Sequence, residues 1–268
     1  MRTAKTTYRS NLENILQQFP FMTQKIETIE PYIRPPWWTS ATKLRIVTTK
    51  DNTADLHEKL QTTAANSRDI MTIYTDGSGI KGKIGAAAYN ATSEETNHQL
   101  LGDETHYNVY ATKLTAIHLA VTQWEKSQTE YPICRIFIDN QAASIAISQP
   151  RTQSGQSIIK TIIDLIDEIM TLHPKRQLEM IWVPGHRGIE GNERADREAK
   201  RAATDPTLSR VFNHNVLKSA RSQDIKTLAK TQWEKEWTEN TTTAKQLRRM
   251  TTKGTAQRRP KIYNNLTS

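Results

Sequence analysis

The chain has 268 residues, of which 36% are hydrophobic and 24% are charged, and its formal net charge is +9. This apolar content suffices for one compact core, and no apolar run approaches the roughly 18 residues that a membrane-spanning helix needs. The N-terminus lacks the apolar core of a signal peptide, and the single Cys134 excludes an internal disulfide and a cysteine zinc site. These features predict an intracellular protein of the cytoplasm or nucleus, with no membrane partner.

The excess positive charge lies near the C-terminus. Residues 207–268 contain 13 Lys and Arg against 4 Asp and Glu, whereas residues 1–206 contain 24 of each sign. A basic segment favours polyanion binding, because contacts with phosphates release counterions. The alternative is a solvated, partly disordered extension, and charge alone does not separate the two.

Residues 1–69 predict weakly helical stretches separated by breakers. The segment PYIRPPWW (residues 31–38) indicates an extended connector, because proline restricts its own backbone and that of the residue before it. Its two tryptophans are expected to pack against a neighbouring domain. Residues 53–66 favour a short helix that leads into the main domain.

From residue 70 onward, short apolar runs bounded by turn residues predict five strands, and amphipathic stretches predict four helices. The strands are expected at 70–76, 84–91, 98–102, 132–139 and 178–183. The helices are expected at 109–126, 140–148, 155–172 and 192–203. Three strands joined by hairpins, followed by strands alternating with helices, predict an α/β fold with a five-stranded mixed sheet flanked by helices.

Three aspartates fall where such a fold would place a site. Asp76 and Asp139 each end an apolar strand, and the glycine-rich segment GSGIKGK (77–83) predicts a hairpin turn directly after Asp76. Asp196 falls on the first turns of the last helix, where backbone N–H groups favour anions. Any one of them has the alternative interpretation of a helix cap. Three carboxylates close together would repel one another without cations between them, so the cluster predicts a metal site.

The segments YTDGSG, IDNQAA and WVPGHRGIEGNERADREA resemble the ribonuclease H family, and among its members the ribonuclease H domains of fungal non-LTR retrotransposon reverse transcriptases. The flanking motifs PYIRPPWW and KTQWEKEW are similar to the same lineage. The resemblance implies a ribonuclease H-like fold with helical extensions at both ends. It divides the chain into a connector of retrotransposon polyprotein type at 1–69, the ribonuclease H domain at 70–204, and a basic, partly disordered helical extension at 205–268.

The resemblance also implies an endonuclease that hydrolyses the RNA strand of RNA–DNA hybrids with two Mg²⁺ ions. Asp76 would bridge both ions, Asp139 would bind one of them and Asp196 the other. His186, in the PGHRG loop, matches the family histidine that assists proton transfer or product release. Contacts to the nucleic acid are expected from Gly77, Ser78, Asn140 and Asn192. The implied partners are the hybrid or another nucleic acid and a reverse transcriptase domain absent from this chain, which itself is expected to be a monomer.

Lys113 departs from the family pattern. Family members read VYxAELxAI, with a metal-binding glutamate where this chain has the lysine of VYATKLTAI. Helical spacing places Lys113 on the edge of its helix that faces the site. Four carboxylates would balance two Mg²⁺ ions, whereas an ammonium roughly 4 Å from each dication opposes it by several kcal/mol. The lysine therefore opposes the metal ions or occupies the place of one of them, and two-metal catalysis is expected to be impaired.

Two alternatives would preserve some activity. Asp103 or Glu104 could supply the missing carboxylate, or Lys113 could extend outward and leave three carboxylates with weak activity. Three functions stay open at this point: a slow RNA–DNA hybrid endonuclease, a catalytically dead nucleic-acid-binding remnant of a decayed element, or a decayed reading frame with no selected role.

Overall fold

The computed structural model describes residues 25–31, 33–45, 57–63, 67–127, 131–185, 188–205, 207–208 and 215–239. The chain divides into two compact units, residues 1–221 and 222–268, and the whole sheet lies in the first of them. Within the described ranges, no helix is both long and apolar enough to span a bilayer.

One mixed sheet forms the centre of the first unit, with its strands in the order β1-β6-β5-β2-β3-β4. The strands are β1 (Lys43–Arg45), β2 (Ile70–Ile80), β3 (Lys83–Asn90), β4 (Thr96–Asp103), β5 (Ile133–Ile138) and β6 (Gln177–Trp182). β2, β3 and β4 form an antiparallel meander, whereas β1, β6, β5 and β2 run parallel. The predicted five-stranded mixed sheet is confirmed, and β1, from the predicted connector, adds a short strand at one edge.

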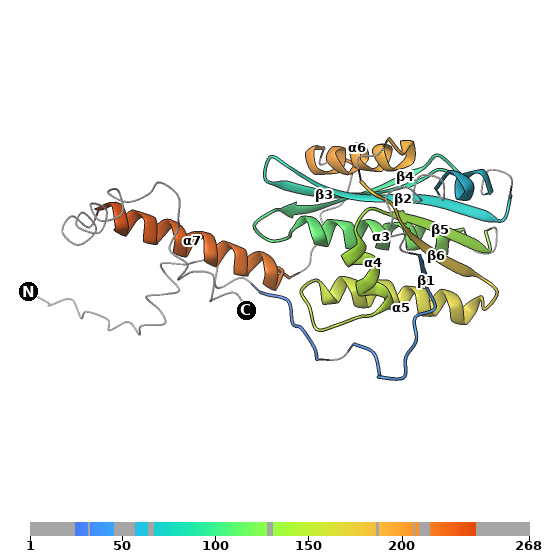
Figure 1. Cartoon of the computed structure of the whole chain (residues 1–268), viewed down its shortest axis with the longest axis horizontal. Helices are drawn as coiled ribbons and strands as arrows, with labels where there is room; N and C mark the ends of the chain where they lie inside the picture. The colour runs from blue at the N-terminus through green and yellow to red at the C-terminus, as the bar shows by residue number, and fades with distance from the viewer. Residues whose placement is uncertain are drawn as a thin grey trace, which may run out of the picture. The chain divides into compact units, whose positions relative to one another are not determined.

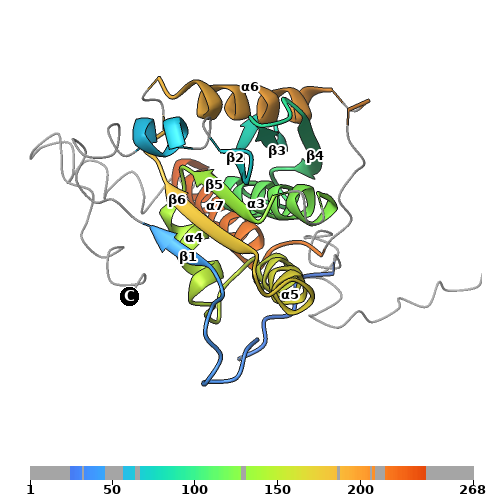
Figure 2. The same cartoon turned by 90° about the vertical axis from the view of Figure 1, so that its right-hand side faces the viewer.

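Helices cover both faces of this sheet (Figure 1, Figure 2). The helices of the first unit are α3 (Val109–Lys126), α4 (Gln141–Ser148), α5 (Gln156–Leu172) and α6 (Glu190–Thr204), with a further short helix at residues 57–63. α7 (Lys218–Glu239) begins in the first unit and continues into the second. α3, α4 and α5 lie on one face, and α6 lies on the other. α3 and α4 begin after Asn108 and Asn140, whose side chains each accept a hydrogen bond from the amide three residues on.

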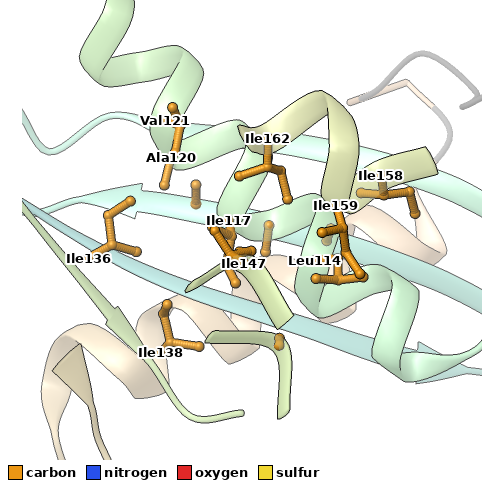
Figure 3. Close-up of a cluster of buried hydrophobic side chains, with 14 of the residues drawn as sticks. Leu114, Ile117, Ala120, Val121, Ile136, Ile138, Ile147, Ile158, Ile159 and Ile162 are labelled. Carbon is orange, nitrogen blue, oxygen red and sulfur yellow. The ribbon is translucent and has the colours of Figure 1, made fainter. Parts of the chain in front are cut away.

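The larger apolar core lies between the sheet and helices α3, α4 and α5. Figure 3 shows part of it, with aliphatic side chains from these helices and from β5 in one layer. Four large apolar side chains of α3 are completely buried in it, namely Leu114, Ile117, Val121 and Trp124. Each such side chain stabilises the fold by about 1.5–3 kcal/mol relative to exposure, so this layer is the main source of stability.

A second, smaller apolar cluster lies on the opposite face of the sheet. Tyr74 of β2 stacks on Phe137 of β5, with 4.9 Å between the ring centroids. His57 Nε2 and Gln61 Nε2, both from the helix at 57–63, lie 2.9 and 2.8 Å from the Tyr74 hydroxyl. The short helix predicted within 53–66 is therefore present, and it covers part of the sheet.

Small residues let α6 lie directly on β2 and β3. A Cβ atom added to Gly85 of β3 would lie 2.5 Å from the backbone nitrogen of Ala203, and one added to Gly191 would lie 2.3 Å from the Tyr74 ring. The small residues at 85–88 therefore allow this helix to pack closely on the strand. Asp196 lies between these two contacts along α6, which explains why a charged residue there is only 8% exposed.

The first hairpin differs from the predicted one. β2 continues to Ile80, so Asp76 lies within a strand rather than at its end, and the expected turn at 77–83 is reduced to Lys81 and Gly82. These two residues have φ values of 52° and 75°, the backbone of a two-residue type I′ turn, whose twist suits antiparallel strands. The glycines before the turn were wrongly assigned to it, because Gly77 serves close packing within the strand instead.

Segments on both sides of the predicted domain pack onto the first unit. Trp38 is partly buried against the larger core, and its indole N–H donates to Asp167 of α5 at 3.2 Å. Leu217, from the predicted C-terminal extension, is 1% exposed in the same core. Trp37 is 81% exposed, so the expected packing of the two tryptophans holds for Trp38 alone.

Candidate active site

Lys113 joins two of the three predicted carboxylates. Its Nζ lies 2.6 Å from Asp76 Oδ1 and 2.7 Å from both carboxylate oxygens of Asp139. The three side chains are nearly enclosed, with 15% of Lys113, 7% of Asp76 and 16% of Asp139 exposed. The ammonium therefore donates to both carboxylates at once, in surroundings where solvent ions screen the charges little.

The sheet register places the two aspartates side by side. β2 and β5 are neighbouring parallel strands that pair Thr75 with Ile138, so Asp76 and Asp139 occupy the next position of each strand. Trp182 Nε1 donates to the backbone carbonyl of Asp139 at 3.0 Å and fixes the chain where β5 ends. The structure thus brings together two of the residues that were predicted to form the site.

The absence of a side chain at Gly77 brings α3 to the same place. A Cβ atom added to Gly77 would lie 2.2 Å from Thr112 Oγ1 and 2.6 Å from the Thr112 backbone carbon. Thr112 is fully buried, and its hydroxyl donates to the carbonyl of Val109 at 2.6 Å. Because Lys113 follows Thr112 directly, this close approach of helix and strand carries its side chain to the carboxylates.

Opposing charges set the protonation of this cluster. Burial and the negative charge of Asp139 raise the pKa of Asp76 to about 6, although the ammonium of Lys113 acts in the other direction. Burial acts to lower the pKa of Lys113, but the attraction of the two carboxylates outweighs it, and that pKa is raised. The lysine is therefore charged at neutral pH and is the cation of the site.

We expect Asp139→Asn to lower the pKa of Asp76, because it removes a negative charge and leaves Lys113 with Asp76 as its one charged partner. A carboxyl pKa raised from 3.8 to about 6 stabilises the folded state below pH 4, and this contribution is lost as the pH rises through 6. The variant should lose less stability across that interval than the wild type. Carbon-13 NMR of the carboxyl group and thermal unfolding from pH 4 to 7 measure the two effects. An unchanged or higher Asp76 pKa would contradict the coupling.

A different lysine holds Asp196. Asp196 Oδ2 accepts from Lys200 Nζ at 2.6 Å, one turn further along α6. Lys200 is 43% exposed, and pairs of this i,i+4 type contribute only about 0.3–0.5 kcal/mol. Separating an enclosed ion pair such as that of Lys113 costs about 3–5 kcal/mol, because a buried charge is left unpaired. Of the two lysines, Lys113 therefore determines the chemistry of the site.

The residues as arranged do not fit a magnesium ion. Magnesium requires oxygen ligands in a nearly octahedral arrangement. Among the residues that the structure describes, no group of three or more His, Cys, Asp or Glu side chains is placed to hold a metal ion. The point on which Asp76 and Asp139 converge holds the ammonium group of Lys113.

The two alternatives for this position are wrong in the described structure. Lys113 turns inward to the carboxylates instead of extending to solvent. Asp103 forms an ion pair with Lys83 at 2.7 Å, and Glu104 is exposed, so neither replaces the missing glutamate.

The loop predicted to carry a proton-transferring histidine begins beside the site. A Cβ atom added to Gly185 would lie 3.4 Å from Asp139 Oδ2. His186 is the next residue and lies outside the described residues, so its role stays a prediction.

The predicted nucleic-acid contacts are mostly engaged within the protein. Gly77 is buried and its N–H donates to Asp76 Oδ1 at 2.7 Å, while Ser78 is half-buried in the β2–β3 ladder. Asn140 Oδ1 accepts from the first turn of α4 as its cap. Asn192 is 3% exposed, and its Oδ1 has no hydrogen-bond partner among the described residues. Their contacts to nucleic acid therefore stay predictions.

Sequence reasoning missed two residues that shape the site. The i,i+4 spacing of Lys200 from Asp196 on a predicted helix was a readable signal of their pairing. Thr112 gave no such signal, because its role depends on the tertiary contact between α3 and Gly77.

Comparison with known proteins connects this arrangement to a family. The RNase H family model matches residues 68–204, a segment that contains Asp76, Lys113, Asp139 and Asp196. The Pol polyproteins of equine infectious anemia virus isolates 1369 and CL22 are each 32% identical to the chain over 155 residues, and that of strain Wyoming is 31% identical. The match covers 58% of this chain and only 12% of each polyprotein.

A solved structure is also similar. The crystal structure of RNase H1 from the halophilic archaeon Halobacterium salinarum NRC-1 matches 51% of this chain and 98% of that chain, with 15% identity and a TM-score of 0.38. The family match alone extends over slightly more than half of the chain. The chain therefore belongs to the RNase H family.

Proposed function

We propose that this chain is a nucleic-acid-binding RNase H domain of a retroelement polyprotein, which binds RNA–DNA hybrid without cutting it efficiently. The observation that carries the proposal is the contact of Lys113 with both Asp76 and Asp139. Of the three functions open at the sequence level, this geometry favours the catalytically dead binding domain over the slow endonuclease.

The enclosed ion pair accounts for the lost cleavage. Metal-assisted hydrolysis of a phosphodiester requires carboxylates that are free to hold divalent ions. To free Asp76 and Asp139, Lys113 would have to leave both partners, at a cost of about 3–5 kcal/mol. Each 1.4 kcal/mol is a factor of ten in affinity, so metal binding at this point should be weaker by at least about a hundredfold.

The same ion pairs favour the approach of a phosphate backbone. Asp76, Asp139 and Asp196 carry three negative charges, and Lys113 and Lys200 cancel two of them. A cluster of carboxylates without partners would repel the phosphates of the hybrid far more strongly. The basic C-terminal segment adds attraction, because residues 207–268 carry the whole net positive charge of the chain.

The finer expectations stay predictions. Similarity to viral Pol polyproteins supports a retroelement polyprotein as the source, and the fungal non-LTR lineage rests on the motif resemblance. A reverse transcriptase partner, a monomeric state, an intracellular location and the domain limits 1–69, 70–204 and 205–268 are likewise predictions.

Removal of divalent metal tests the proposal. We expect the whole chain to bind a labelled RNA–DNA hybrid equally well in Mg²⁺ and in EDTA, and to leave the RNA strand intact in both. Affinity should fall as salt rises, because phosphate contacts release counterions. A variant that ends at Arg221 lacks ten Lys and Arg and four Asp and Glu, so it should bind less tightly and with a shallower salt dependence.

Two results would contradict this function. Cleavage in Mg²⁺ that Asp139→Asn abolishes would identify a working endonuclease. A folded chain that neither binds nor cuts the hybrid would favour the decayed reading frame.

A further inference from the structure

Glu27 precedes the segment that matches the family, yet its side chain is only 8% exposed. Its carboxylate accepts hydrogen bonds from the hydroxyl of Ser154, from the amide of Gly155 at 2.9 Å and from the amide of Lys218 at 2.8 Å. Ser154 and Gly155 immediately precede α5, and Lys218 is the first residue of α7. One carboxylate thus accepts donors at the N-termini of two helices, where backbone N–H groups lack partners within the helix.

The backbone around Glu27 is paired as well. Glu27 N donates to the carbonyl of Val216 at 2.9 Å, and Val216 N donates to the carbonyl of Lys25 at 3.0 Å. Further along, the side chain of Gln156 bonds both the amide and the carbonyl of Glu30, each at 2.7 Å. The N-terminal segment is therefore bound to the start of α5 and to the chain that leads into α7.

We name residues 215–221 the root of α7. Leu217 N donates to the carbonyl of His106 at 3.0 Å, and Asn108 Nδ2 donates to the hydroxyl of Ser219 at 3.0 Å. Asn108 is also the N-cap of α3, the helix that carries Lys113 in its second turn. The root that Glu27 holds is thus fixed at the beginning of the helix that supplies the cation of the site.

From these contacts we infer that the folded unit of this domain includes the N-terminal segment at residues 25–31 and the root of α7, and that Glu27 is the residue that fastens both flanks to it. The carboxylate is a positioning residue: it holds the N-terminal segment, the start of α5 and the root of α7 in one place. The second unit, residues 222–268, follows this root directly in the chain and contains ten Lys and Arg. This inference concerns the fold of the flanks and does not depend on the proposed function.

Amide hydrogen exchange of the whole chain, measured by NMR without nucleic acid, tests the inference. In Glu27→Gln, exchange should rise about tenfold or more at Gly155 and at the amides of the root, because the charged acceptor is lost. Amides of β2 and β5 should stay protected. Glu30→Gln is the matched control: it removes the same charge three residues on, from an exposed residue that bonds Gln156 through its backbone. It should leave all these amides as protected as in the wild type.

Ser154→Ala is a second variant, which keeps the carboxylate and removes one of its donors, together with the hydroxyl that accepts from the Ser219 amide at 3.0 Å. It should raise exchange at the same amides by a smaller factor. Wild-type exchange at Gly155 and the root in Glu27→Gln would overturn the inference. A loss of protection spread equally over β2 and β5 would also overturn it, because Glu27 would then support the whole fold rather than the flanks.

Discussion

Replacing Lys113 by glutamate should turn this domain into a magnesium-dependent nuclease. We expect the RNA strand of an RNA–DNA hybrid to be cut at least about a hundredfold faster by Lys113→Glu than by the wild type. The substitution removes an ammonium that lies 2.6–2.7 Å from both carboxylates and supplies oxygen ligands from the same helical position. The change thus both removes the cation and adds an anion at the point where Asp76 and Asp139 converge.

Metal binding gives a second readout that does not depend on cleavage. Isothermal titration should show no Mg²⁺ binding at this cluster in the wild type and measurable binding in Lys113→Glu. In the variant, added Asp139→Asn should abolish both the binding and the cleavage. Cleavage by the wild type at the rate of Lys113→Glu would contradict the argument, because it would mean that the lysine leaves its partners at no cost.

Two further variants separate the effects of charge and ligand. Lys113→Met removes the ammonium without adding a ligand, so it should recover some metal binding and less activity than the glutamate. Lys200→Gln removes the ion pair with Asp196, but that pair is partly exposed and weak. The change should therefore alter the cleavage rate by less than about threefold relative to the wild type. If Lys113→Glu binds Mg²⁺ but does not cut, the remaining defect lies elsewhere in the site, and the loop that carries His186 is the first place to look.

Much of the fold follows from patterns that need no tertiary information. α3 was predictable to the residue, because an apolar stripe of helical spacing begins just after Asn108, which caps the helix. β5 was predictable as a covered strand, because its residues are almost all apolar. β1 was not, because a three-residue edge strand has no periodicity of its own and exists only through its pairing with β6.

The site was predictable to a similar depth. Motif spacing pointed to Asp76 and Asp139, and helical spacing placed Lys113 on the edge of α3 that faces them. The sequence could not show whether the ammonium turns inward, because its direction depends on how closely α3 approaches β2. The glycines after Asp76 were wrongly assigned to a turn, since a glycine required by close packing and one required by a turn look the same in a sequence.

Gly77→Ala tests that distinction and should be strongly destabilising. The added Cβ atom would lie 2.2 Å from Thr112 Oγ1 and 2.6 Å from the Thr112 backbone carbon, so rotation of a side chain cannot relieve the contact. Overpacking of this kind costs about 1–3 kcal/mol, and the involvement of a helix backbone favours the upper part of that range. Urea unfolding of the whole chain without nucleic acid measures the loss.

Gly79→Ala is the matched control on the same strand. Its Cβ atom would lie 3.3 Å from Cγ2 of Ile84, a side chain that can shift by a few tenths of an ångström, so the loss should stay below about 1 kcal/mol. An equal loss in both variants would contradict the view that Gly77 fixes the approach of α3. A negligible loss for Gly77→Ala together with weakened hybrid binding would instead assign this glycine to contact with nucleic acid, as the family resemblance implies. The two roles are thus separable, because the packing role changes stability with no nucleic acid present and the contact role does not.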